Sequence, residues 1–105
     1  MPGITPRRVC LYAVVPAGEA DGVRASTRGL RSMVCGPVAA IVGKPGNEST
    51  RAALRHDRVV GRAVEVCSSV VPFRLGVELQ SETELQEVLH ANLELLSGHL
   101  ARFHG

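Results

Sequence analysis

A leucine stripe near the end of the chain constrains the fold most. Apolar residues recur every three or four positions from Leu85 to Phe103, the period of one helix face. Ser81 and Glu84 have the spacing of a capping box, which predicts that this helix begins just after Ser81. The helix must bury its stripe against another layer. The stripe comprises Leu85, Leu89, Leu93, Leu96, Leu100 and Phe103, flanked by Val88 and Leu95.

A second helix is predicted over residues 50–67. Asn47 or Ser49 precedes it as a candidate cap, and the Ser68-Ser69 pair follows its end. One face of this helix carries small, apolar and histidine side chains at helical period. These are Ala53, His56, Val60, Ala63, Val64 and Cys67.

Three runs rich in β-branched residues predict strands, over residues 9–15, 30–42 and 70–79. The middle run is interrupted at Gly36-Pro37, either by a bulge or by a tight turn. Strands and helices together predict an α+β fold with two layers. We expect a small, mainly antiparallel sheet of three or four strands with the two helices on one face. A length of 105 residues fits one domain, residues 1–105, with a flexible N-terminus over about residues 1–8.

Composition argues against several functional classes. There are one Tyr, two Phe and no Trp, and the net charge is +2, so a base-stacking nucleic-acid surface is disfavoured. The three cysteines form no C-x-x-C pair, which argues against a disulfide framework and a zinc site. We expect no cofactor and no metal. The apolar run after the first arginines ends at Pro16, too short for a membrane span, so we expect a cytoplasmic protein.

Pro72 and Arg74 are unusual inside an apolar strand. Proline lacks the N–H that a ladder needs, so Pro72 predicts an edge or a bulge. Arg74 then points towards an acidic partner or along the sheet. Two interpretations stay open: a docking edge for a partner, or a strand start with an outward arginine.

His56 lies on the apolar face of its predicted helix, beside Asp57. An enzyme would use His56 with Asp57 or Cys67, but no nucleophile or metal is identified within reach. We therefore favour a buried histidine that is hydrogen-bonded to the strand backbone, and we expect no catalytic residue and no enzyme.

Charged side chains form two predicted ridges. The interpretations are a head-to-tail contact between copies, an acidic protein or lipid headgroups as partner, or simply two solvated faces. The basic ridge consists of Arg51, Arg55, Arg58 and Arg62, and the acidic ridge of Glu84, Glu87 and Glu94. The residues of both ridges, together with Pro72 and Arg74, are the candidate partner-binding residues.

Three stretches resemble the gas vesicle GvpF/GvpL family. LYAVVPA resembles the opening strand of that family, and PVAAIVGKP a later strand. The segment LRHDRVVGRAVEVCSSVVPFRLGVELQSETELQEVL resembles its most recognisable part, a helix with His-acid-Arg followed by a Pro-x-Arg strand and a capped helix. The resemblance covers most of the chain from Val9 onward.

The resemblance implies an N-terminal, ferredoxin-like α+β domain and a non-enzymatic accessory role in gas vesicle assembly. Members of the family bind the small hydrophobic shell protein. Against the family pattern, Leu75, Val77 and Cys67 replace the usual residues, and we expect the C-terminal half of the family to be missing from this chain. We expect a protein associated with gas vesicles that binds the shell protein or a sister accessory protein. The alternative is a repurposed interaction module that self-associates or caps another assembly, and an open sheet edge is available for strand addition.

Overall fold

A five-stranded antiparallel sheet forms the centre of the protein. The computed structural model of the chain describes residues 8–25, 27–45 and 50–102. The strands are β1 (Val9–Pro16), β2 (Arg31–Cys35), β3 (Val38–Gly43), β4 (Val71–Pro72) and β5 (Glu78–Leu79). Their order is β2-β3-β1-β4, and β5 also pairs with β1. The predicted α+β class with a small antiparallel sheet is therefore confirmed.

Strand β1 is buried on both of its faces. Every residue from Val9 to Val15 is buried, because β3, β4 and β5 cover the two edges of β1 and a separate apolar cluster covers each of its faces. Its sequence is a continuous apolar run without apolar–polar alternation, which is typical of a strand covered on both faces.

The predicted run over residues 30–42 folds as a hairpin of β2 and β3. Cys35 faces Val38 across the ladder, so Gly36 and Pro37 alone form the turn. Gly36 has a φ of 57°, the positive value required at the first central position of a type II′ turn. Of the two alternatives, the tight turn is therefore confirmed.

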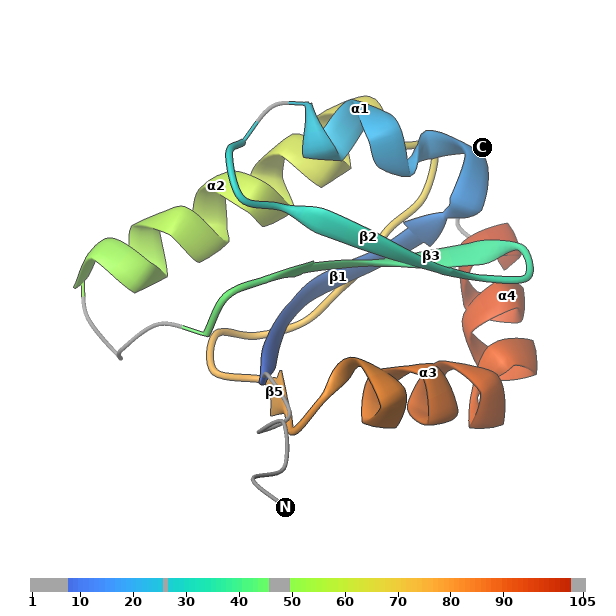
Figure 1. Cartoon of the computed structure of the whole chain (residues 1–105). Helices are drawn as coiled ribbons and strands as arrows, with labels where there is room; N and C mark the ends of the chain where they lie inside the picture. Colours follow the sequence, from blue (N-terminus) through green and yellow to red (C-terminus); the bar gives the residue numbers. More distant parts are fainter. Residues whose placement is uncertain (1–7, 26, 46–49, 103–105) are drawn as a thin grey trace, which may run out of the picture.

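Helices cover both faces of the sheet, as Figure 1 shows. Helices α1 (Ala20–Arg24) and α2 (Thr50–Val66) lie on one face. The short 3₁₀ helix η1 (Ala17–Glu19) directly precedes α1 in the chain. Helices α3 (Glu82–Ala91) and α4 (Leu93–Arg102) lie on the other. The expectation of two layers, with both predicted helices on one face, is wrong. A sheet that is apolar on both faces needs a helical cover on each.

Two apolar cores lie on either side of the sheet. On the α2 side, Val59 and Ala63 pack with Tyr12 and Ile41. On the α3–α4 side, the leucine stripe packs on the opposite residues of β1 and β3, through Leu85, Leu89 and Leu100, with Leu93 and Leu96 partly buried. The stripe is thus confirmed as the buried side of this segment for the residues described.

The predicted C-terminal helix is interrupted at Asn92. Asn92 has φ −113° and ψ 15°, and its side-chain Nδ2 donates to the backbone oxygen of Val88 over 2.8 Å. Asparagine competes in this way for helical carbonyls, so the helix ends and a second one starts. The single helix predicted to reach about Phe103 is therefore wrong, and Phe103 lies outside the described residues.

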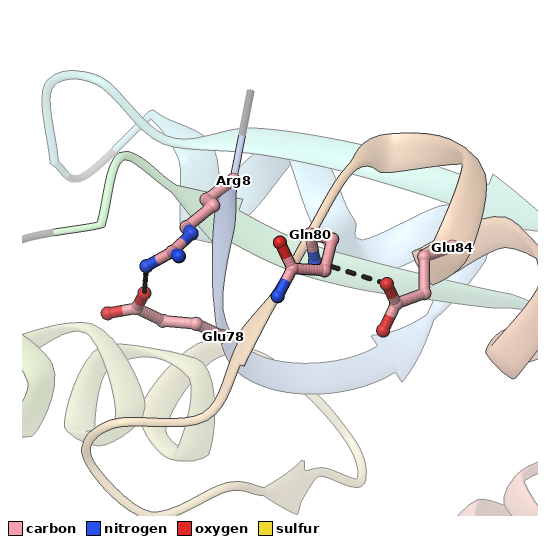
Figure 2. A network of polar contacts seen from close by, with 4 residues as sticks. All are labelled: Arg8, Glu78, Gln80 and Glu84. Atoms are coloured by element: carbon pink, nitrogen blue, oxygen red, sulfur yellow. Dashed lines mark hydrogen bonds and ion pairs between the residues drawn. The ribbon is translucent and has the colours of Figure 1, made fainter. Parts of the chain in front are cut away.

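The predicted capping box begins α3. Ser81 Oγ accepts a hydrogen bond from the backbone N–H of Glu84 over 3.1 Å. The Glu84 carboxylate accepts from the N–H of Gln80 over 3.3 Å, one residue before the usual position (Figure 2). Arg8 and Glu78, 4.0 Å apart, form an ion pair beside this turn (Figure 2). The candidate caps of α2, Asn47 and Ser49, lie outside the described residues.

Candidate partner-binding surface

The predicted third strand, residues 70–79, is divided into β4 and β5. The N–H of Phe73 donates to Tyr12 O over 3.0 Å, and the N–H of Leu11 donates to Val77 O over 2.9 Å. Between these two bonds, residues 74–76 leave the sheet as a turn, with Gly76 at a φ of 96°. A single continuous strand is therefore wrong. Pro72 lies on the edge strand β4, opposite Ala13, as its missing N–H predicted.

His56 connects α2 to this edge strand. Its Nε2 donates to the backbone oxygen of Phe73 over 2.5 Å, and the residue is only 5% exposed. A carbonyl only accepts hydrogen bonds, so Nε2 carries the proton. Nδ1 is buried and has no hydrogen-bond partner among the described residues. The favoured interpretation of a buried histidine bonded to the strand backbone is confirmed.

Tyr12 extends this contact to Arg55. The rings of Tyr12 and His56 have centroids 5.3 Å apart. Arg55 Nε donates to the Tyr12 hydroxyl over 3.2 Å, and Arg55 Nη2 donates to the backbone oxygen of Arg28 over 2.8 Å. Arg55 thus holds the buried tyrosine and the loop before β2. Arg55 is therefore half-buried and is not simply part of a solvated ridge, because the tyrosine hydroxyl offers the guanidinium an acceptor.

A pocket of about 390 Å³ lies between α2 and the turn after β4. Its walls are mainly apolar, and its two charged lining residues, Asp57 and Arg74, are exposed. Neither has an ion-pair partner within the described part of the chain. Such a pocket suits an apolar group that carries polar atoms at its margin. The lining residues are Ala53, His56, Asp57, Val60, Phe73, Arg74 and Leu75.

Exposed apolar residues lie on α2 and in the turn after β4, and one of them, Leu75, lines the pocket. Leu54 is 59% exposed and Val64 is 61% exposed, and Leu75 in the turn is also exposed. Val64 was expected on the buried face, but the buried positions of α2 are His56, Val59 and Ala63. The sequence interpretation missed Leu54 and Leu75. In the sequence, Leu54 is an apolar residue outside the helical stripe, and Leu75 is an apolar residue beside the glycine of a turn.

The other arginines of the predicted ridge differ in their surroundings. Arg51, Arg58 and Arg62 are exposed. Arg62 Nη1 lies 3.1 Å from the Glu65 carboxylate, an i, i+3 pair on the same helix. Arg51 and Arg58 make no ion pair within the ranges that the structure describes.

The acidic residues lie across the sheet from these arginines. Glu84 is half-buried and serves the start of α3, whereas Glu87 on α3 and Glu94 on α4 are exposed. Because Asn92 separates the two helices, the three glutamates do not form one continuous ridge.

Of the residues considered for catalysis, Cys67 does not line the pocket that contains His56 and Asp57. Cys67 Sγ donates to the backbone oxygen of Glu19 at 3.8 Å. Burial, reinforced by the Glu19 carboxylate, raises the pKa of the Cys67 thiol from 9.0 to about 11, which disfavours the nucleophilic thiolate. Among the described residues no hydrogen bond joins His56 to Asp57 or Cys67. The same residues contain no helix long and apolar enough to cross a membrane.

Comparison with known proteins gives one match. A family model described as gas vesicle synthesis protein GvpL/GvpF matches residues 9–105. No curated protein and no solved structure matches the chain significantly.

Proposed function

The chain belongs to the gas vesicle synthesis GvpL/GvpF family, and we propose that it is a non-enzymatic accessory protein that binds the vesicle shell protein or a sister accessory subunit. The observation that carries this proposal is the family match, which spans every helix and strand of the fold. Family membership implies a role in gas vesicle synthesis and an association with gas vesicles. We therefore propose that the protein acts in the cytoplasm.

The pocket beside His56 is the proposed contact for the partner. The His56–Phe73 bond fixes the turn after β4 against α2, so the pocket exists before a partner arrives. Preformed pockets lower the entropic cost of binding, because no loop has to be ordered. The pocket also unites the two stretches that most resemble the family, His56-Asp57-Arg58 and Pro72-Phe73-Arg74.

The chemistry of the surface indicates what the partner presents. Leu75 is exposed and lines the pocket, which suits an apolar side chain of a hydrophobic partner. Arg74 and Asp57 add one charge of each sign at the same place, which favours a partner with a matched pair of charges. The accessory protein would thereby shield apolar surface of the shell protein before assembly.

Co-expression with the shell protein and affinity capture tests this function. We expect the wild-type chain to capture the shell protein, and we expect Leu75→Asp and Arg74→Glu each to reduce capture at least about tenfold. Lys44→Glu is the matched control, because Lys44 is exposed and does not line the pocket. Its capture should equal that of the wild type.

Either of two results would overturn the proposal. If the folded wild-type chain captures neither the shell protein nor a co-expressed accessory protein, the proposed function is wrong. Capture that is unaffected by the Leu75 and Arg74 variants would remove the pocket as the contact.

A further inference from the structure

The protein carries opposite charges on its two helical faces. Residues 20–30 and 50–66, which include α1 and α2, contain six arginines and three acidic residues, a net charge of +3. Residues 82–102, which form α3 and α4, contain four glutamates and one arginine, a net charge of −3 with neutral histidines. The sheet separates the two sets, as Figure 1 shows.

Unpaired charges and exposed apolar residues occur together on each face. On the α2 face, Arg51 and Arg58 lie on the same helix as Leu54 and Val64. Arg51 and Arg58, like Glu87 and Glu94 opposite, form no ion pair with any other described residue.

The α3–α4 face repeats this combination with the opposite sign. Glu87 on α3 and Glu94 on α4 accompany Val88 and Leu95, and Leu95 is 71% exposed. Exposed apolar groups bordered by charged ones are the usual composition of an interaction surface.

We propose that the partner of each face is a second copy of this chain, so that the α3–α4 face of one copy docks on the α2 face of the next. The charges are complementary, which favours correct docking and penalises contacts between like faces. Each face also brings apolar residues for the other to cover. Because the faces lie on opposite sides of the sheet, the contact is head to tail and leaves one face open at each end of the assembly.

Sedimentation velocity of the full chain tests the electrostatic part. At low salt we expect an average mass above the 11.2 kDa of one chain, which increases with concentration. In about 1 M salt the screening length is about 3 Å, so the mass should fall towards that of one chain. A single chain at every salt and protein concentration would overturn the proposal.

Two variants test the head-to-tail geometry. Leu54→Asp places an acid on the α2 face, and Leu95→Asp places one on the α3–α4 face. Both side chains are largely exposed, so folding should be retained, which circular dichroism checks. Each variant alone should be monomeric, because every contact then contains one damaged face.

An equimolar mixture of the two variants is decisive. The intact α3–α4 face of Leu54→Asp can dock on the intact α2 face of Leu95→Asp, whereas the other pair of faces carries two added acids. The mixture should therefore form complexes of two chains and nothing larger. A mixture that stays monomeric, or single variants that associate like the wild type, would contradict head-to-tail docking.

Val34→Asp is the matched control, since Val34 is 55% exposed on the edge strand β2 and lies on neither α2 nor the α3–α4 pair. It should associate like the wild type. This inference does not depend on the proposed function: Leu95→Asp leaves the pocket intact and should still capture the shell protein if the pocket binds it.

Discussion

His56 Nε2 lies 2.5 Å from the backbone oxygen of Phe73 and links helix α2 to the edge of the sheet. The two residues are far apart in the chain, and each belongs to one of the two stretches that most resemble the family. The bond gives the histidine a structural role, and its other ring nitrogen, Nδ1, is buried and not open to a substrate.

Replacement of His56 by Ala should destabilise the fold by about 2 kcal/mol, since it leaves the Phe73 carbonyl without its donor and opens a cavity. Urea unfolding followed by circular dichroism measures this change. His56→Gln, which retains an N–H donor, should recover part of the loss. A loss below about 0.5 kcal/mol for His56→Ala would show that the bond is unimportant.

Glycines at two positions should respond to alanine with opposite signs. A Cβ on Gly43 would lie 2.9 Å from Tyr12 Cε2, inside the buried core, so Gly43→Ala should cost about 1–3 kcal/mol. A Cβ on Gly61, exposed in the middle of α2, meets nothing within 4 Å. Gly61→Ala should therefore stabilise the protein by about 0.5–1 kcal/mol. Thermal unfolding of both variants checks the signs, and equal effects would contradict the close approach of Tyr12.

Removal of the Ser81 hydroxyl should weaken the start of α3. Ser81→Ala deletes the acceptor for the Glu84 N–H and should lower the free energy of unfolding by about 1 kcal/mol. Thr83→Ala, at an exposed position of the same turn, is the control and should change it by less than about 0.5 kcal/mol. Chemical denaturation separates the two variants, and equal losses would argue against the cap.

The Cys67 thiol should resist alkylation. Its folded pKa of about 11 lies above the ordinary 9.0, so the protonated thiol is favoured in the folded state. The resulting stabilisation is complete below pH 9.0 and disappears as the pH rises towards about 11. Over that window the chain should lose stability relative to Cys67→Ala, as denaturation at several pH values would show.

Mass-spectrometric alkylation rates give a second test of the same thiol. At pH 8 iodoacetamide should react with Cys67 more slowly than with a free cysteine. Glu19→Gln should accelerate the reaction, because Glu19 contributes to the raised pKa. A thiol in the folded chain that reacts as fast as free cysteine would contradict the expected pKa.

Local patterns predicted the elements that depend on neighbouring residues. The capping box at Ser81, the helix starting at Thr50 and the strand from Val9 all rest on spacings within one segment. The edge position of Pro72 also followed, because a missing N–H has the same consequence in any sheet.

Features that depend on distant residues escaped the sequence patterns. Arg55 leaves the predicted ridge because its acceptor is Tyr12, a residue on another element. The pocket joins α2 to the turn after β4, and helical periodicity gives no sign of that contact. The placement of helices on both faces was visible in principle, since β1 is apolar at every position from Val9 to Val15.

The central place of β1 also determines the order in which the fold can be completed. During synthesis β1 emerges first and finds β3 after the hairpin, but its other neighbours, β4 and β5, appear much later. Until α3 and α4 leave the ribosome, one apolar face of the growing sheet has no cover. Pairings between distant segments are slow to form and expose nascent chains to aggregation. We therefore expect a newly made chain to need chaperones until α3 and α4 have packed against the sheet.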